Sequence, residues 1–316
     1  MSAADCGSGL RPRKPEAAPP ERFAAGGRSH KNPAQRPGAD AVAAKGWLAA
    51  HKWLLLRRLS QIGILSLFLA GPWFGLWIVK GNLSSSLTLG VLPLTDPFVL
   101  LQSLAAGHWP YKEALLGAGI VLAFYLLVGG RVFCAWVCPI NPVTDAAAWL
   151  RRRLGLKGGK APHAATRYWL LAFTLVAAFA TGGIVWEWVN PVSMLHRGLI
   201  FGLGLTWGVV LAVFLYDLTL AGRGWCGHVC PMGAFYGLLG KGALLRVSAG
   251  KRAECNDCMD CFAVCPEPQV IRPALKAAGQ THPLILDHDC TTCGRCIDVC
   301  SKNVFRLTTR FDRSES

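Results

Sequence analysis

Eight cysteines near the C-terminus fall into two runs with the same spacing. Residues 255–265 read CNDCMDCFAVC, and residues 290–300 read CTTCGRCIDVC. Both follow C-x2-C-x2-C-x3-C, the spacing of bacterial ferredoxins, in which three cysteines of a run bind one iron–sulfur cluster and the fourth binds the other. We therefore predict two [4Fe–4S] clusters with crossed ligands: Cys255, Cys258, Cys261 and Cys300 for the first, and Cys290, Cys293, Cys296 and Cys265 for the second.

A zinc ribbon and a disulfide framework are the other common uses of closely spaced cysteines. Zinc sites usually pair two C-x2-C units across a dozen or more residues and do not need eight thiolates in two identical runs. Cluster ligands must stay as thiolates, which favours the reducing bacterial cytoplasm over a compartment where disulfides form. The two runs therefore predict a protein that carries electrons.

A second cysteine pattern occurs twice, closer to the N-terminus. Residues 130–139 read GRVFCAWVCP and residues 222–231 read GRGWCGHVCP, so both follow G-R-x-x-C-x3-C-P. Residues four apart share one face of a helix, so each pair could present two sulfurs to one point. Four such sulfurs could bind a metal or a further cluster, or cycle between dithiol and disulfide, whereas the alternative is that they are small buried hydrophobic residues. A matched pair in both repeats favours a functional role, of undetermined kind, for Cys134, Cys138, Cys226 and Cys230.

The composition indicates a membrane protein. Apolar residues make up 52% of the 316 residues, charged residues make up 16%, and there are 12 tryptophans. Four apolar runs of roughly 17–23 residues match the ~30 Å hydrocarbon core of a bilayer. The net charge of +15 could suggest nucleic-acid binding, but the basic residues lie mainly in the N-terminal tail and between the apolar runs, as they do in membrane proteins. We expect no nucleic-acid partner. The apolar runs cover about residues 60–79, 114–130, 168–189 and 199–221.

These patterns predict an α-helical integral membrane protein with four transmembrane helices, arranged as two tandem hairpins, and a small C-terminal α+β domain of the bacterial ferredoxin type. Residues 1–45 are rich in Ala, Pro and Gly and are predicted to be a disordered basic tail, in which the lone Cys6 is a bystander. We assign residues 46–245 to the membrane domain, residues 246–311 to the ferredoxin domain and residues 312–316 to a short tail.

The distribution of Lys and Arg gives the predicted orientation. Residues 131–167, between the second and third apolar runs, carry seven Lys and Arg, whereas the other two segments between runs carry two and one. Residues 131–167 are therefore expected in the cytoplasm. With four spans, both termini and the ferredoxin domain also lie there, and the protein is a multi-pass protein of the bacterial inner membrane.

Longer stretches resemble the NapH family, the membrane subunits of the quinol dehydrogenase that serves periplasmic nitrate reductase. The resemblance covers about residues 46–311. It rests on the segments LRRLSQ, AGPWFG, LTDPF, LQSLA, CAWVCPINPVTD, WEWVNPVS, WCGHVCPMGAFYG, CMDCFAVCPEP and CGRCIDVCS. Ser301 stands where ferredoxins usually have Pro, and the NapH family carries Ser there as well.

This resemblance implies that quinol is oxidised in the membrane and that electrons pass to a periplasmic iron–sulfur partner of the NapG kind. That partner would feed c-type cytochromes, a membrane-bound one among the candidates, ahead of nitrate reductase. The chain has no C-x-x-C-H motif and no obvious pair of haem-ligating histidines in its apolar runs, so we predict no haem. The predicted clusters are cytoplasmic and the implied acceptor is periplasmic, so electrons either cross the bilayer inside the protein or bypass these clusters.

A quinol site needs a group that accepts protons and an apolar or aromatic slot for the ring. Glu187, between two tryptophans at the outer end of the third apolar run, is the candidate acceptor, with a nearby histidine as an alternative. Glu187 could equally be an interfacial residue flanked by tryptophans. Asp217 is expected to pair with Arg223 or another cytoplasmic base. The sequence Asp96-Pro97 predicts the start of a short helix in the first outer loop.

CcoG-type proteins, which handle or reduce copper during oxidase assembly, share this layout and form the main alternative. In that interpretation the four C-x3-C-P sulfurs are metal ligands. The segments WEWVNPVS and LTDPF resemble the NapH family specifically, and the added C-terminal domain of the CcoG type is not expected here. A redox sensor would carry a signalling or DNA-binding segment, which the sequence does not show.

Overall fold

The chain begins with two short helices and one long apolar helix: α1 (Ala39–Lys45), α2 (Trp47–Ala50) and α3 (Lys52–Phe74). The computed structural model describes residues 36–312 except 157–158, 160, 203 and 277–281. The predicted N-terminal tail up to residue 35, Cys6 included, and the C-terminal residues from 313 onward lie outside the described residues.

The prediction of disorder as far as residue 45 is wrong for its last part, because α1 packs against the ferredoxin domain. The Gly38 amide donates to Asp260 Oδ2 at 2.9 Å, and Lys45 Nζ donates to the Ile297 carbonyl oxygen at 2.9 Å. Composition alone shows no apolar face that could offset the ordering entropy of this segment. The contacts with a distant part of the chain supply that compensation.

Helix α3 starts on the ferredoxin domain and leads away from it. Its first-turn amides at Trp53 and Leu54 donate to the two carboxylate oxygens of Asp298, at 3.1 and 2.9 Å. The carboxylate accepts hydrogen bonds from amides that have no partner within the helix, and its negative charge interacts favourably with the positive end of the helix dipole. Among the described helices, α3 is the one that is long and apolar enough to cross a membrane.

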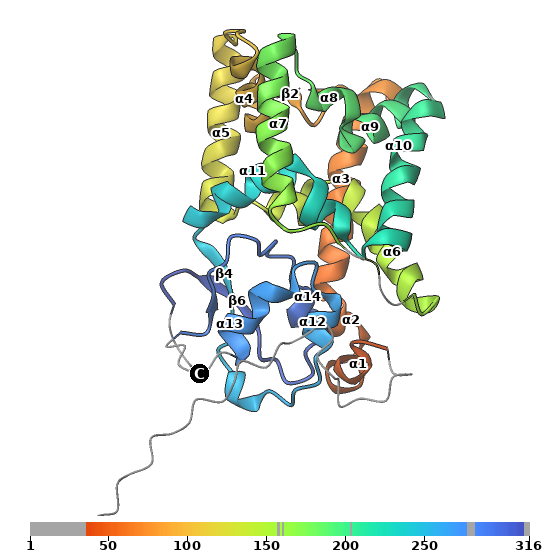
Figure 1. Ribbon diagram of the computed structural model, residues 1–316, viewed down its shortest axis with the longest axis vertical. Coiled ribbons are helices and arrows are strands. Elements are labelled where there is room, and N and C mark those ends of the chain that lie inside the picture. Colours follow the sequence, from red (N-terminus) through yellow and green to blue (C-terminus); the bar gives the residue numbers. More distant parts are fainter. Residues whose placement is uncertain (1–35, 157–158, 160, 203, 277–281, 313–316) are drawn as a thin grey trace, which may run out of the picture.

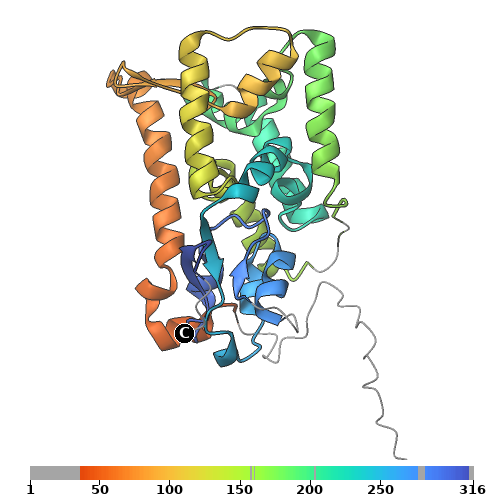
Figure 2. The ribbon, with the colours of Figure 1, turned by 90° about the vertical axis from the view of Figure 1, so that its left-hand side faces the viewer.

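A small antiparallel sheet follows α3 and has the strand order β1-β2-β3. Figure 2 shows it at the end of α3 that lies far from the ferredoxin domain. The next helix begins at Pro97, and Asp96 caps it by accepting a hydrogen bond from the Phe98 amide at 2.9 Å, so the predicted helix start is confirmed. These elements are β1 (Val79–Gly81), β2 (Ser85–Thr88), β3 (Leu92–Thr95) and α4 (Pro97–Ala105).

Three further apolar helices, α5 (Lys112–Val128), α7 (Thr166–Thr181) and α10 (Gly204–Leu215), stand in the upper part of Figure 1. Each coincides with a predicted apolar run, but none reaches the 23 residues of α3. Helix α7, for example, ends at Gly182 in the left-handed conformation. The four-span topology therefore stays a prediction. The other helices of this part are η1 (Phe133–Val137), α6 (Ile140–Arg153), α8 (Trp186–Val189), α9 (Pro191–Phe201), η2 (Tyr216–Leu220), η3 (Trp225–Val229), α11 (Pro231–Leu239) and η4 (Gly240–Gly242).

The C-terminal domain combines a three-stranded antiparallel sheet with short helices. Strand β4 lies in the centre, and its Val247 pairs with Ile285 on one side and Leu307 on the other. Buried Ile271 and Phe305 complete the apolar core with these strands. This is a ferredoxin-type α+β domain. Its elements are β4 (Leu245–Ser248), η5 (Arg252–Glu254), α12 (Asp260–Val264), η6 (Pro268–Val270), α13 (Ile271–Lys276), β5 (Leu284–Ile285), α14 (Arg295–Val299) and β6 (Arg306–Thr309).

Candidate functional site

Two cavities in the ferredoxin domain are each lined by four cysteines. Each encloses about 360 Å³, with some open solvent at its mouth included. The first set combines the first three cysteines of the first run with the last cysteine of the second run. The other set combines the first three cysteines of the second run with the last cysteine of the first run. The structure thus brings together Cys255, Cys258, Cys261 and Cys300 at the first cavity, and Cys265, Cys290, Cys293 and Cys296 at the second.

The loops that carry these cysteines have the same backbone shape in both runs. Positive φ angles occur two and four residues after the first cysteine, at Asp257 and Met259 in one run and at Thr292 and Gly294 in the other. Such conformations are costly for residues other than glycine and occur mainly at functional sites. At Gly294 a Cβ atom would lie 2.4 Å from the Trp53 side chain, so only glycine fits. The repeated strain curls each loop around its cavity.

The surroundings of these cysteines suit ligands of a cationic iron–sulfur cluster better than they suit free thiols. Burial raises the pKa of Cys261 to about 12 and that of Cys290 to about 11. Burial also opposes ionisation of Cys293, but Arg295 and Arg57 outweigh it and lower the pKa of that thiol to about 7. Thiols that burial keeps protonated become ligands when a metal centre replaces the proton.

The spacing of the sulfurs argues against a single metal ion. In the part of the chain that the structure describes, the one group of three or more His, Cys, Asp or Glu ligand atoms within 4.8 Å of one another contains no cysteine. A tetrahedral zinc ion with Zn–S bonds of about 2.3 Å would place its sulfurs only about 3.8 Å apart. Among the described residues, the cysteine sulfurs are therefore not as close together as the ligands of one tetrahedral zinc ion.

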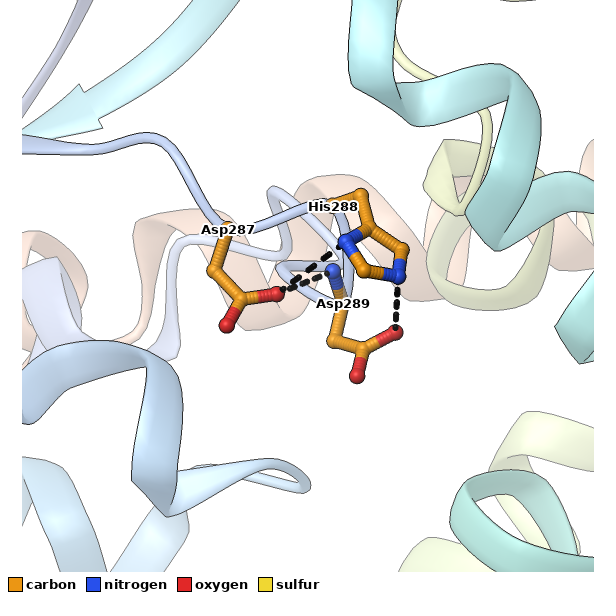
Figure 3. Close-up of side chains that lie close together, drawn as sticks. All are labelled: Asp287, His288 and Asp289. Atoms are coloured by element: carbon orange, nitrogen blue, oxygen red, sulfur yellow. Dashed lines mark hydrogen bonds and ion pairs between the residues drawn. The ribbon is translucent and has the colours of Figure 1, made fainter. Parts of the chain in front are cut away.

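Within the described residues, the one close group of possible ligands lies in the segment before the second run: Asp287, His288 and Asp289, whose side chains are shown in Figure 3. Asp289 is already paired, since its carboxylate accepts a hydrogen bond from Arg167. His288 Nε2 lies 3.0 Å from the Tyr168 hydroxyl. Both partners belong to the start of α7. The group therefore links the second cysteine run to the helical part. The positive charge next to it is the guanidinium of Arg167.

The four C-x3-C-P cysteines lie together where the helical part meets the ferredoxin domain. Each pair lies on a single π-helical turn: the Cys138 amide donates to the Phe133 carbonyl oxygen, and the Cys230 amide to that of Trp225, both at 2.9 Å. The expected α-helical geometry is therefore corrected to a π turn, a conformation often found at functional sites. The thiol of Cys226 interacts electrostatically with the other three, so the two repeats form one site.

Two helix N-termini point at this site. Helix α6 begins after Cys138, where the amides of Ile140 and Asn141 favour the ionised form of that sulfur. Helix α11 begins after Cys230, where the amides of Met232 and Gly233 have the same effect on the Cys230 sulfur. Amides at a helix N-terminus and the helix dipole stabilise negative charge. The proline that ends each motif therefore starts a helix whose amides stabilise a thiolate.

Two buried arginines connect this site to the second ferredoxin cavity. Arg131 Nη1 lies 2.7 Å from Glu267 Oε1 and 2.9 Å from the carbonyl oxygen of Asp289, and its Nη2 donates to the carbonyl oxygen of Cys226 at 3.1 Å. Arg167 Nη1 lies 3.2 Å from the same oxygen of Glu267. Both arginines are 1% exposed. Glu267 follows Cys265 closely in the sequence, and Asp289 directly precedes Cys290; both cysteines belong to the second cavity. The two arginines therefore fix the distance between the two cysteine sites.

Trp136 makes a second connection between the same sites. It lies between the two cysteines of the first repeat, and its Nε1 donates to the carbonyl oxygen of Thr292 at 3.2 Å. Thr292 lies between two cysteines of the second cavity. The indole of Trp53 packs edge-on against Trp136 with ring centroids 6.1 Å apart. A side chain of the first repeat thus touches the cysteine loop of the ferredoxin domain directly.

A third link is a single carboxylate held by four arginines. Asp145 on α6 accepts two hydrogen bonds of 2.7 Å from Arg295 of the ferredoxin domain and pairs with Arg223 at 3.2 Å. Arg58 also donates to it, and Arg57 lies 3.9 Å away. Burial would raise the pKa of Asp145, but the four guanidinium groups hold it well below its usual range.

The predicted polar residues have other partners than expected. Asp217 accepts a hydrogen bond from the Trp225 amide at 2.9 Å and interacts electrostatically with Arg223 and Arg151, whereas the ion pair of Arg223 is with Asp145, so the expected direct Asp217–Arg223 ion pair is replaced by a longer-range interaction. Glu187 accepts hydrogen bonds from Asn190 at 2.8 Å and Ser193 at 2.6 Å, at the start of α9. Its role as a proton acceptor stays a prediction.

Sequence reasoning missed the residues that connect the two parts, namely Arg131, Arg167, Asp145 and Glu267. One signal was present, because each cysteine repeat begins with Gly-Arg, at residues 130–131 and 222–223. A charged residue repeated with the cysteines indicated a partner, but the spacing could not identify it.

Comparisons with known proteins agree with this geometry. A family model described as "4Fe-4S binding domain" matches residues 113–157 and 199–252, and one described as "4Fe-4S dicluster domain" matches residues 254–304. The chain is 57% identical to the methylamine utilization ferredoxin-type protein MauN of Methylorubrum extorquens over 86% of this chain and 94% of that protein. It is 52% identical to the ferredoxin-type protein NapH of Escherichia coli over 87% of this chain and 95% of that protein. The MauN protein of Paracoccus denitrificans is 56% identical over 85% of this chain and 95% of its own length. No solved structure matches the chain.

Proposed function

Because the chain belongs to the family of ferredoxin-type proteins that includes NapH and MauN, we propose that it oxidises quinol at the bacterial inner membrane and passes the electrons to a periplasmic iron–sulfur partner. An electron-transfer role follows from the iron–sulfur domains themselves. The observation that carries the proposal further is the direct contact between the C-x3-C-P site of the helical part and the second ferredoxin cavity through Arg131 and Trp136. A soluble ferredoxin has no use for such a coupled site at the end of apolar helices.

Three [4Fe–4S] clusters are proposed as the cofactors. Two would be held by the eight cysteines around the ferredoxin cavities, with the crossed ligands given above. The third would be held by the four C-x3-C-P cysteines, whose thiols form one site at the N-termini of two helices. Clusters bound at these places supply one-electron carriers, which a two-electron donor such as quinol requires. The protein holds them at fixed separations through Arg131, Arg167 and Trp136.

The proposed topology has four spans, with both termini and the ferredoxin domain in the cytoplasm. Helix α3 has the length of a complete span, and α5, α7 and the α10–η2 run supply shorter apolar helices beside it. The basic residues between the second and third apolar runs support this orientation.

The physiological acceptor has two candidates. NapH relatives favour a NapG-like periplasmic iron–sulfur protein and c-type cytochromes ahead of nitrate reductase. The MauN relatives, whose name refers to methylamine utilization, are as similar to the chain, so electron exchange with that pathway is the second candidate. The two differ in the partner and share the cysteine sites.

Copper handling is the other class of function considered for the C-x3-C-P cysteines. A copper ion with three or four sulfur ligands needs sulfurs that are close together, and among the described residues no three sulfurs lie within 4.8 Å of one another. This spacing favours a cluster. If the purified protein bound copper stoichiometrically at these cysteines and failed to oxidise quinol, the copper interpretation would replace the proposal.

The proposal is tested on protein purified without oxygen and returned to lipid vesicles. We expect about twelve iron atoms per chain, and reduction of the clusters when decylubiquinol or menadiol is added. The double variant C134S/C226S should retain about eight iron atoms and lose reduction by quinol, while dithionite still reduces its ferredoxin clusters. C6S is the matched control, because Cys6 lies outside both motifs. Zinc in place of iron, or full activity in the double variant, would refute the proposal.

A further inference from the structure

Asp96 is a carboxylate buried on the far side of the cysteine site, and one of its oxygens has no partner. Its side chain is 4% exposed. The Oδ1 atom accepts hydrogen bonds from the Phe98 amide at 2.9 Å and from the Tyr236 hydroxyl at 3.0 Å. The Oδ2 atom has no hydrogen-bond partner among the described residues. A buried carboxylate oxygen without a partner is costly, so it needs an explanation beyond capping α4.

Tyr236 connects this carboxylate to the C-x3-C-P site. It lies on α11, the helix whose N-terminus points at the Cys230 sulfur. Its ring stacks on Phe133 with centroids 4.9 Å apart and an angle of 12° between the planes. Phe133 directly precedes Cys134 of the other repeat. A continuous set of packed side chains therefore leads from Asp96 to the cysteines of both repeats.

Other titratable groups face Asp96 from two further elements. Tyr125 on α5 interacts electrostatically with Asp96 and packs edge-on against Tyr236, with ring centroids 5.0 Å apart. Glu187 on α8 also interacts with Asp96 electrostatically. Tyr236 thus contacts Asp96 through a hydrogen bond, and Glu187 acts on it through its charge.

We propose that Asp96 and Tyr236 form the proton-transfer pair of the electron-donor site, which takes up the protons released as a quinol gives its electrons to the protein. The inference rests on the proposed function. Oxidation of one quinol breaks two O–H bonds and releases two protons and two electrons. The electrons go to the periplasmic iron–sulfur partner, which is the oxidant. The protons bind one at a time to the Asp96 carboxylate, and Glu187 is the next carboxylate on their way to the solvent.

The ionisation of Asp96 suits this role. Burial, reinforced by the charge of Glu187, raises the pKa of Asp96 to about 7, although the hydrogen bonds from Phe98 and Tyr236 oppose the rise. A base with a pKa near the working pH can both accept a proton and release it. Below that pH the carboxyl is protonated and cannot accept, so the rate of quinol oxidation should rise as pH increases through about 7.

The test compares D96N, Y236F and D96A in lipid vesicles, with decylubiquinol as the donor. Asn caps helices about as well as Asp, so D96N keeps the capping bond and loses only the proton-accepting charge. We expect D96N to slow quinol oxidation by about 100-fold or more and to abolish the rise with pH, while dithionite reduces the same number of clusters as in wild type. Y236F should keep the stacking on Phe133 and shift the pH profile.

The outcomes separate the two hypotheses. If D96N retains the wild-type rate and pH profile while only D96A loses protein, Asp96 is a helix cap and the inference is wrong. If the wild-type protein fails to oxidise quinol although dithionite reduces its clusters, the proposed function is wrong and the inference falls with it. If D96N does not accumulate in the membrane, Y236F decides, since an unchanged pH profile in that variant overturns the pair.

Discussion

Removal of the Asp145 charge should loosen the ferredoxin domain from the helical part. Asp145 on α6 is 14% exposed and pairs with Arg295 of the ferredoxin domain, Arg223 of the second repeat and the two arginines of α3. In D145N the side chain keeps its shape but loses its charge. Four guanidinium groups then face one another in a largely buried space, because only Arg58 among them reaches 25% exposure.

The expected cost follows from the chemistry of buried ion pairs. Removing one partner of such a pair typically costs about 3–5 kcal/mol, because the remaining charge is left buried and uncompensated. That range corresponds to about a 160-fold to 4,700-fold shift of the equilibrium between docked and undocked domains. Arg295 also interacts with the sulfurs of Cys293, 3.7 Å away, and Cys265, so we expect the lower end of the range.

The assay is hydrogen exchange and limited proteolysis of residues 254–304 in detergent-solubilised protein, together with thermal unfolding. D145N should speed the exchange of this domain and lower its unfolding temperature. D312N is the matched control: its partner Arg306 is 42% exposed and Asp312 itself 27%, so that ion pair should contribute at most about 1 kcal/mol. Equal protection and equal unfolding temperatures in D145N and D312N would refute the reasoning.

Three further predictions follow from the site. C258S and C293S should each lose about four iron atoms, one cluster apiece, which iron analysis and electron paramagnetic resonance would detect; a full iron content in either variant contradicts the crossed ligands. Reporter fusions after residue 85 should read periplasmic and fusions after residue 245 cytoplasmic, and a periplasmic signal at 245 would reverse the placement of the ferredoxin domain. E187Q should slow quinol oxidation and change its pH dependence while both ferredoxin clusters remain, and an unchanged rate and pH profile would leave Glu187 as an interfacial residue without a role in proton transfer.

The cysteine spacing predicted local geometry well because the loops are short. The crossed sets around the two cavities need only the order of cysteines along each run and the return of α14 beside α12. The start of α4 was likewise readable, since Asp96 and Pro97 act within one turn. The π turns were not, because a spacing of four residues fits an α-helix as well, and the hydrogen bonds that choose between them leave no mark in the sequence.

Contacts between side chains far apart in the chain could not be predicted from the sequence, for a different reason. Arg131 and Glu267 lie 136 residues apart, and no local pattern links an arginine to one carboxylate among many. The same limit explains α1, whose order depends on contacts with Asp260 and Ile297 more than two hundred residues away. The ion-pair partner of Arg223 was also not predictable, because Arg223 pairs with Asp145 on another element and acts on Asp217 through its charge.

The two arginines of the repeated Gly-Arg motif explain which ferredoxin cavity the helical part holds. Arg131 donates to the carbonyl oxygen of Asp289, just before Cys290, and Arg223 donates to the carbonyl oxygen of Val264, just before Cys265. Both contacts therefore end beside cysteines of the second cavity. The two copies of the repeat are equivalent in sequence, but each contacts a different one of the two cysteine runs that line the second cavity. Among the described residues, neither arginine makes such a contact with the first cavity, so we expect the proposed electron transfer between the C-x3-C-P site and the ferredoxin domain to pass through the second cavity.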